Sequence, residues 1–232
     1  MCYRGIWPMT RKITIAGKQM EPNALYAWAL GSMTRALFFY GQAVSEKKNK
    51  ILCAISAYYS LFHLTMAIGL LCPSLIPDKD LKDINERLEG GLTDPSSHLS
   101  HKKMKAWMNI FIQKGLPKDL LHALETAEMI RSFVNYGPRT KWEGGDIIIN
   151  TCKTTPETLD RLVDKLPELI EHFITWGCKN GENNGIWVES ALSRAEFPAN
   201  FYKEWSTPKV VNIWHKFRKK LIKKARSIVY KK

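Results

Sequence analysis

Apolar residues recur at helical spacing along most of the chain, and the breaks between these runs predict where helices begin and end. We expect helices over 24–45, 50–72, 78–90, 101–114, 117–136, 156–178 and 209–230. The stretches 11–20 and 147–149 favour extended structure, and 186–208 is predicted to be rich in loops. The fold class is therefore all-α: an antiparallel bundle of four to five helices with a basic helical extension at the C-terminus.

Interruptions in this pattern predict how the chain is divided. The run Lys-Asn-Gly-Glu-Asn-Asn-Gly at 179–185 is rich in the residues that favour turns and linkers. We predict an N-terminal arm over 1–22, a helical bundle over 23–178, a linker over 179–185 and the basic extension over 186–232.

Arg131 departs from the apolar pattern of its own helix. At about 100° per residue, it falls within the face that its apolar neighbours form. Those neighbours are Leu116, Leu120, Ala123, Leu124, Ala127 and Val134. A guanidinium that points into a core must be paired or hydrogen-bonded, so Arg131 is either a structural clamp, on a carboxylate such as Glu128 or Glu125, or part of a site.

Positive charge is concentrated at the C-terminal end. The net charge is +13, yet residues 201–232 hold 11 Lys or Arg and one acidic residue. The last helix places an apolar stripe beside the cations Lys216, Arg218, Lys219, Lys220, Lys223, Lys224 and Arg226. We expect these cations, with Arg139, to bind the phosphates of a nucleic acid. The same pattern also fits an anionic membrane surface, a docked protein or a merely solvated face.

Residues 51–77 carry no charged side chain, and this run is long enough for a membrane span. Tyrosine, serine, threonine and histidine interrupt the run, so we expect a buried core helix and no membrane partner.

The five cysteines are scattered and fit a reducing, cytoplasmic compartment. His98 and His101 have ligand spacing but no further ligands beside them, and no phosphate-binding glycine loop is present. We therefore expect no metal and no cofactor.

Two segments resemble the HEPN family of small helical bundles, which occur in RNA-cleaving toxins and defence proteins. The first is Ala54-Ile-Ser-Ala-Tyr58-Tyr59-Ser-Leu-Phe62-His63, similar to the family's Ala-Tyr-Tyr-x-x-Phe-His signature. The second runs from His101 to Arg131-Ser-Phe-Val-Asn135-Tyr136-Gly-Pro138. The resemblance covers roughly 24–178 and implies a homodimer through the Arg131 helix.

Active members of that family carry an arginine, then four to six residues, then a histidine. Here the residue after four intervening positions is Tyr136, a poor general base at neutral pH because its ordinary pKa is near 10. The resemblance makes Arg131, Asn135 and Tyr136 candidate catalytic residues. His63 joins them if it faces Arg131 across the bundle. Each also has a structural interpretation: clamp, helix cap, packed aromatic and core histidine.

Three functions stay open on these residues. The leading one is an RNA-interacting module, catalytically weak or inactive, in a bacterial defence or toxin–antitoxin-like system. The second is a metal-independent endoribonuclease that uses Arg131 with Tyr136 or a nearby histidine. The third is a scaffold or inhibitory subunit of a larger effector, bound through Val210, Trp214 and Phe217 of the last helix.

Overall fold

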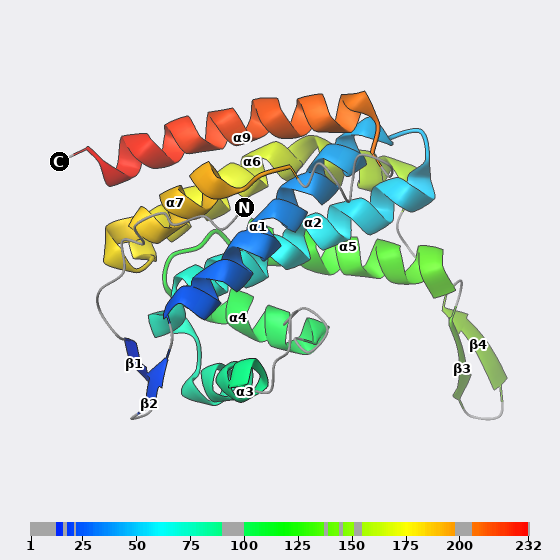
Figure 1. Cartoon of the computed structure of the whole chain (residues 1–232). Helices are drawn as coiled ribbons and strands as arrows, with labels where there is room; N and C mark the ends of the chain where they lie inside the picture. Colours follow the sequence, from blue (N-terminus) through cyan, green and yellow to red (C-terminus); the bar gives the residue numbers. More distant parts are fainter. Residues whose placement is uncertain are drawn as a thin grey trace.

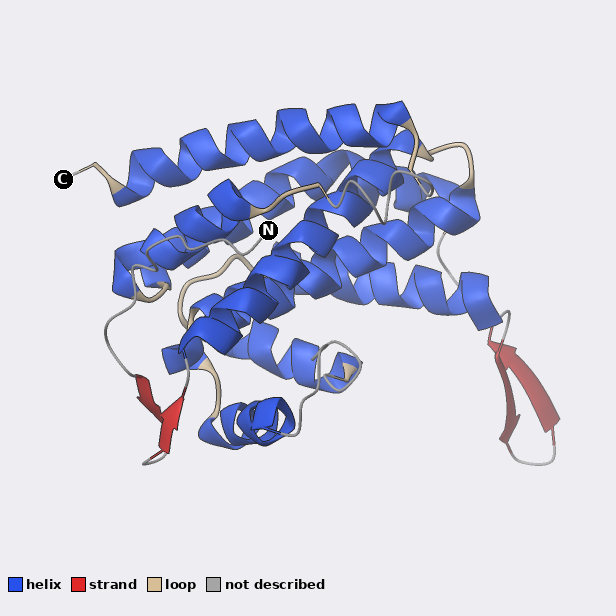
Figure 2. Cartoon of the chain, viewed as in Figure 1, coloured by secondary structure: helices blue, strands red, loops and turns tan. Residues whose placement is uncertain are grey.

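The computed structural model describes residues 13–15, 18–20, 22–89, 100–136, 139–143, 146–150, 155–197 and 206–231. A few of these, Tyr136 and the four short strands included, are described by their backbone alone. Within the described residues the chain is mostly helical, and the predicted all-α class is confirmed (Figure 2). The helices are α1 (Pro22–Ser45), α2 (Lys50–Leu71), α3 (Asp78–Glu89), α4 (His101–Gln113), α5 (Asp119–Tyr136), α6 (Pro156–Asn180), α7 (Ile186–Arg194) and α9 (Pro208–Val229).

Capping side chains fix where several helices begin. The Ser100 hydroxyl accepts a hydrogen bond from the backbone N–H of Lys103 at 3.2 Å, and Thr155 does the same for Thr158 at 3.4 Å. Thr207 caps α9 in the same way. The predicted ends of the seven expected helices differ from the observed ends by two residues at most.

α2 forms the centre of the fold. It packs along α1 over its length and also contacts α4, α5 and α6 (Figure 1). Among the described residues α2 is long and apolar enough to cross a membrane, yet 78% of its most apolar window is buried inside this chain. Every residue from Leu61 to Leu71 is buried. The contacts of α2 are therefore those of a core helix.

α9 lies along α1, α6 and α7 and is part of the same core (Figure 1). The ring of Phe217 lies 4.2 Å from that of Tyr40 on α1, measured between centroids. Arg226 Nε lies 2.9 Å from the Glu189 carboxylate of α7. The stripe that faces the bundle consists of Val210, Trp214, Phe217, Leu221 and Ala225, all buried. Because the chain's own core takes up this stripe, we propose no partner protein on it.

The loop-rich prediction for 186–208 is wrong over its first nine residues, which form α7. Trp187, Val188, Ala191 and Leu192 supply its buried face, but one short helical period is a weak signal beside an Asn/Gly-rich run. No capping side chain marks its start, because Gly185 stands at that position in a left-handed conformation with φ +79°. The first two residues of the predicted linker, Lys179 and Asn180, end α6, and the rest forms a tight turn in which η3 (Asn183–Gly185) joins α6 to α7.

Two small hairpins occupy the stretches predicted to be extended. β1 (Ile13–Ile15) pairs antiparallel with β2 (Lys18–Met20), and β3 (Arg139–Glu143) pairs antiparallel with β4 (Asp146–Asn150). The second hairpin leaves the end of α5 (Figure 1). These strands add no layer to the bundle.

Candidate functional site

Arg131 lies on α5 where that helix packs against α2, and its side chain is half-buried. Its Nη2 donates a hydrogen bond to the hydroxyl oxygen of Tyr59 at 3.2 Å. The guanidinium carbon lies 5.3 Å from the ring centroid of Tyr58 and 5.6 Å from that of Tyr59. At such distances a ring face attracts a cation. The two tyrosines of the Tyr-Tyr motif therefore hold the guanidinium at the α2–α5 contact.

His101, the first residue of α4, also contacts Tyr58. Its Nδ1 is hydrogen-bonded to the Tyr58 hydroxyl, and the two ring centroids are 5.3 Å apart. Burial, followed by the positive charge of Arg131, lowers the pKa of His101 below its ordinary 6.5. Burial raises the pKa of Tyr58, so its hydroxyl keeps its proton. We call Arg131, Tyr58, Tyr59 and His101 the arginine site.

The carboxylates predicted as clamps for Arg131 lie on its own helix. Glu128 forms an ion pair with Lys105 of α4, with the Nζ and Oε2 atoms 2.6 Å apart. Glu125 is exposed. The α4–α5 ion pair keeps one negative charge near the arginine site, since the Glu128 charge contributes to the raised pKa of Tyr58.

His63 is buried, with 6% of its surface exposed. Its ring stacks on Phe39 of α1, 5.7 Å between centroids and 4° between planes, and on Tyr59 at 6.0 Å. Tyr59 thus contacts both His63 and Arg131. His101 is only partly buried and shares Tyr58 with the guanidinium, so it is the histidine that a substrate beside Arg131 could reach.

The other candidates of the Arg131 segment are placed as follows. Asn135 is exposed, one turn beyond Arg131 on α5. Tyr136 ends α5, and Arg139 begins β3, but the side chains of both lie outside the described residues.

The seven predicted phosphate-binding cations of α9 divide into paired and unpaired residues. Arg218 donates through Nε to the Leu192 carbonyl at 2.8 Å, Lys220 pairs with Glu171, and Arg226 pairs with Glu189. Within the described part of the chain, no ion pair is found for the four others. They are Lys216, Lys219, Lys223 and Lys224, all exposed.

Three of those lysines share one side of α9. Lys216, Lys219 and Lys223 are three and four residues apart, so they lie within about 60° of one another around the helix. Over seven residues the helix rises about 10 Å, which sets the length of this row. Lys224 lies about 100° further round. We call Lys216, Lys219 and Lys223 the lysine face.

Sequence reasoning did not predict the contact of His101 with Tyr58. His101 was a possible metal ligand with His98 and the start of the second HEPN-like segment, and His98 lies outside the described residues. No group of three or more metal-ligand side chains occurs among the residues that the structure describes. The available signal was its position directly after the Ser100 cap, since such a residue starts a helix and is held in a fixed direction.

Comparisons with family models, with curated proteins and with solved structures found nothing that matches this chain.

Proposed function

We propose that this chain is a cytoplasmic, HEPN-like RNA-binding protein of a bacterial defence or toxin–antitoxin-like system, with weak or absent catalysis. The observation that carries the proposal is the lysine face, a row of three exposed cations without acidic partners among the described residues. Acidic side chains elsewhere on the bundle neutralise neighbouring cations such as Lys103 and Lys105. An uncompensated row of that kind attracts a polyanion more strongly than scattered lysines do.

The resemblance to the HEPN family supports RNA as that polyanion. In this chain the guanidinium of Arg131 contacts the ring of Tyr58, the first tyrosine of the Tyr-Tyr motif, although the two residues are far apart in the sequence. The position that the family fills with histidine is Tyr136 here. For this reason we propose RNA binding as the first function and RNA cleavage only as the second candidate.

The proposal is tested by the salt dependence of RNA binding. For binding to a single strand, each neutralised phosphate contributes about −0.7 to the slope of log K against log salt. The lysine face alone should therefore give a slope of about −2 between about 50 and 200 mM salt, measured by fluorescence anisotropy. Affinity that stays constant over this range, or no binding at low salt, would count against the proposal.

A second candidate function is a metal-independent endoribonuclease, favoured by the position of His101 beside Tyr58 and Arg131. In the tautomer whose Nδ1–H donates to the Tyr58 oxygen, Nε2 of His101 carries the lone pair of a general base. The lowered pKa keeps this imidazole neutral at neutral pH. Arg131 would stabilise the charge that develops on the phosphate.

For this candidate, RNA should be cleaved in EDTA, and Arg131→Ala should slow cleavage by about 10²–10³-fold. Arg161→Ala, an exposed arginine on α6, is the matched control and should leave the rate unchanged. Because the base must be unprotonated, the rate should be flat near neutral pH and fall only below pH 6.5. Cleavage that persists in Arg131→Ala would exclude this mechanism.

We further propose a homodimer formed through α5. Met129 and Phe133 are 45% and 39% exposed, and they lie one turn apart on the face of α5 that points away from Arg131. A two-fold axis at this apolar pair would bring two arginine-bearing helices together. Met129→Lys combined with Phe133→Lys should give a folded monomer by light scattering, whereas Tyr230→Lys, at a 60% exposed aromatic site near the C-terminal end, should not. A wild-type monomer at high concentration would contradict the proposal.

A further inference from the structure

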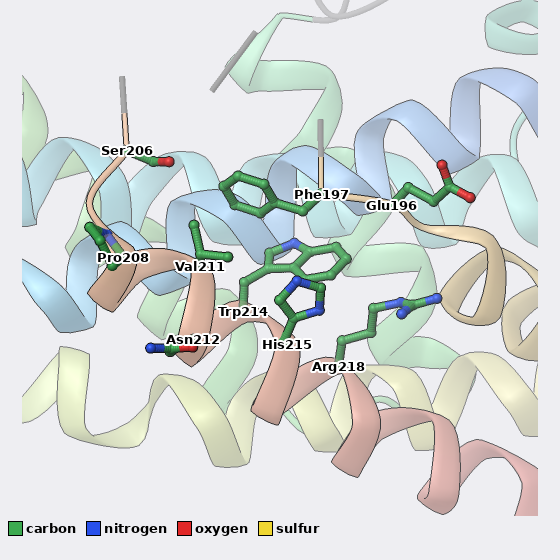
Figure 3. A pocket seen from close by; sticks show the side chains of 9 residues that line it. All are labelled: Glu196, Phe197, Ser206, Pro208, Val211, Asn212, Trp214, His215 and Arg218. Carbon is green, nitrogen blue, oxygen red and sulfur yellow. The ribbon is translucent and has the colours of Figure 1, made fainter. Parts of the chain in front are cut away.

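A pocket of about 740 Å³ opens beside the first turns of α9, between that helix and the segment that follows α7 (Figure 3). Phe197 forms one wall, and Val211, Trp214, His215 and Arg218 of α9 form the other. The volume is typical of pockets that hold small organic groups. The residues 198–205, which join Phe197 to Ser206, lie outside the described part of the chain.

Three aromatic rings line this pocket. The ring of Trp214 is 5.6 Å from that of Phe197 and 4.8 Å from that of His215, and both pairs are nearly perpendicular. Phe197 and His215 are 6.4 Å apart and tilted by 34°. In Figure 3 the rings of Phe197 and His215 both lie beside that of Trp214. Rings arranged in this way favour a planar aromatic guest over an aliphatic one.

Two polar atoms in the pocket wall lack a hydrogen-bond partner among the described residues. These atoms are Trp214 Nε1 and Ser206 Oγ; both are buried, and Trp214 as a whole is only 1% exposed. A buried donor that stays unpaired costs free energy, so a guest that brings acceptor atoms would relieve it. The indole N–H faces the space next to Phe197 and Val211 in Figure 3.

Arg218 closes one end of the pocket and is held rigidly. Its Nε donates to the Leu192 carbonyl at 2.8 Å, its Nη2 donates to the Ser193 carbonyl, and its guanidinium lies 5.3 Å from the Trp214 ring centroid. Both carbonyls are at the end of α7. Arg218 therefore anchors α9 to α7 and fixes the plane of the indole, which leaves the pocket preformed.

The pocket also borders the lysine face. His215 precedes Lys216 in the sequence and lies one turn before Lys219, so the aromatic lining and the cations occupy adjoining sides of α9. A single-stranded nucleic acid presents the matching pair of groups, a phosphate and an unstacked base joined by one ribose.

We infer that the pocket takes one unstacked nucleobase of a single-stranded RNA whose phosphates lie on the lysine face. The ring faces of Phe197 and His215 would stack on the base, and its carbonyl or ring-nitrogen acceptors would receive the Trp214 N–H and the Ser206 hydroxyl. This inference rests on the proposed function and adds to it the kind of RNA, a single strand, and the place of one base.

The test compares a short oligouridylate with an abasic ribose-phosphate chain of equal length and charge. The wild-type protein should bind the oligouridylate about fivefold to a hundredfold more tightly. His215→Ala, at an exposed position, and Val211→Phe, which fills the pocket, should each abolish most of this preference while keeping the affinity for the abasic chain. Unfolding in urea checks that both variants remain folded.

The outcomes separate the two proposals. Equal binding of both chains by the wild-type protein overturns the pocket inference and leaves the proposed function intact. Failure to bind either chain overturns the proposed function itself. Uridine monophosphate that binds with the affinity of the oligouridylate, and loses it in Val211→Phe, overturns the assignment to RNA because a free nucleotide would then be the ligand. Loss of the preference in both pocket variants supports the inference.

Discussion

Gly185→Ala is expected to lower the stability of the protein severely. Gly185 has φ +79°, a backbone conformation that costs an L side chain free energy whatever the space around it. An added Cβ would also lie 1.9 Å from the carbonyl oxygen of Cys178, and that oxygen belongs to the backbone of α6 and cannot rotate away. A loss of more than about 4 kcal/mol in the free energy of unfolding follows, measured by urea denaturation.

The effect of Gly185→Ala should reach the functional surface. Gly185 begins α7, and α7 supplies Glu189 to Arg226 and the Leu192 carbonyl to Arg218. If the turn cannot form, α9 loses both anchors. Since the lysine face lies on α9, RNA affinity should fall together with stability.

Two other glycines serve as controls for this substitution. Gly115 has φ +89° but no neighbour within 4 Å of an added Cβ, so Gly115→Ala should cost only about 1–2 kcal/mol. Gly31 lies inside α1 with open space around it, and Gly31→Ala should stabilise the protein by about 0.5–1 kcal/mol. Unfolding of Gly185→Ala within 1 kcal/mol of the Gly115 variant would mean that the α6–α7 turn is not formed as described.

The positions of most helices follow from the sequence because local signals determine them. The Ser100 and Thr155 caps and the proline at the start of α6 act within three residues of the helix ends. α7 lacked such a signal, since Gly185 has no side chain to cap it and its apolar face spans two turns at most. Its helical state depends on contacts with α1, α6 and α9, which the local sequence does not reveal.

The arginine site could be predicted only in part for a related reason. Helical periodicity was sufficient to place Arg131 toward the bundle, because that requires only one helix. Its contacts with Tyr58 and Tyr59 join residues more than 70 positions apart, and His101 reaches Tyr58 across 43. Contacts of that range depend on how α2, α4 and α5 cross, so the choice between His63 and His101 needed the assembled bundle.

The apolar stripe of α9 was also visible in the sequence, but its binding partner was not. Val210, Trp214 and Phe217 fit a docked protein as well as they fit the chain's own bundle. In the structure they are buried against the bundle, and this fixes the side of α9 that faces outward. The lysine face follows from that orientation.

Reversing the charge of the lysine face is expected to lower RNA affinity by about a hundredfold. In Lys216→Glu, Lys219→Glu, Lys223→Glu, three phosphate-binding cations become anions that repel the same phosphates. The slope of log K against log salt should become shallower by about 2, at 0.7 for each lost phosphate contact on a single strand. Folding should be unaffected, because all three side chains are exposed and have no ion-pair partner among the described residues.

The matched control carries the same change in net charge elsewhere. Lys79, Lys102 and Lys118 are exposed on α3, on α4 and before α5, and their replacement by glutamate removes an equal amount of positive charge. If RNA is held by the lysine face, the control variant should keep most of the affinity and nearly the full salt slope, because exposed charges beyond about 10 Å are screened at 0.1 M salt. Equal losses in the two variants would mean that only the overall charge of the protein attracts RNA, and α9 would then have no special part in binding.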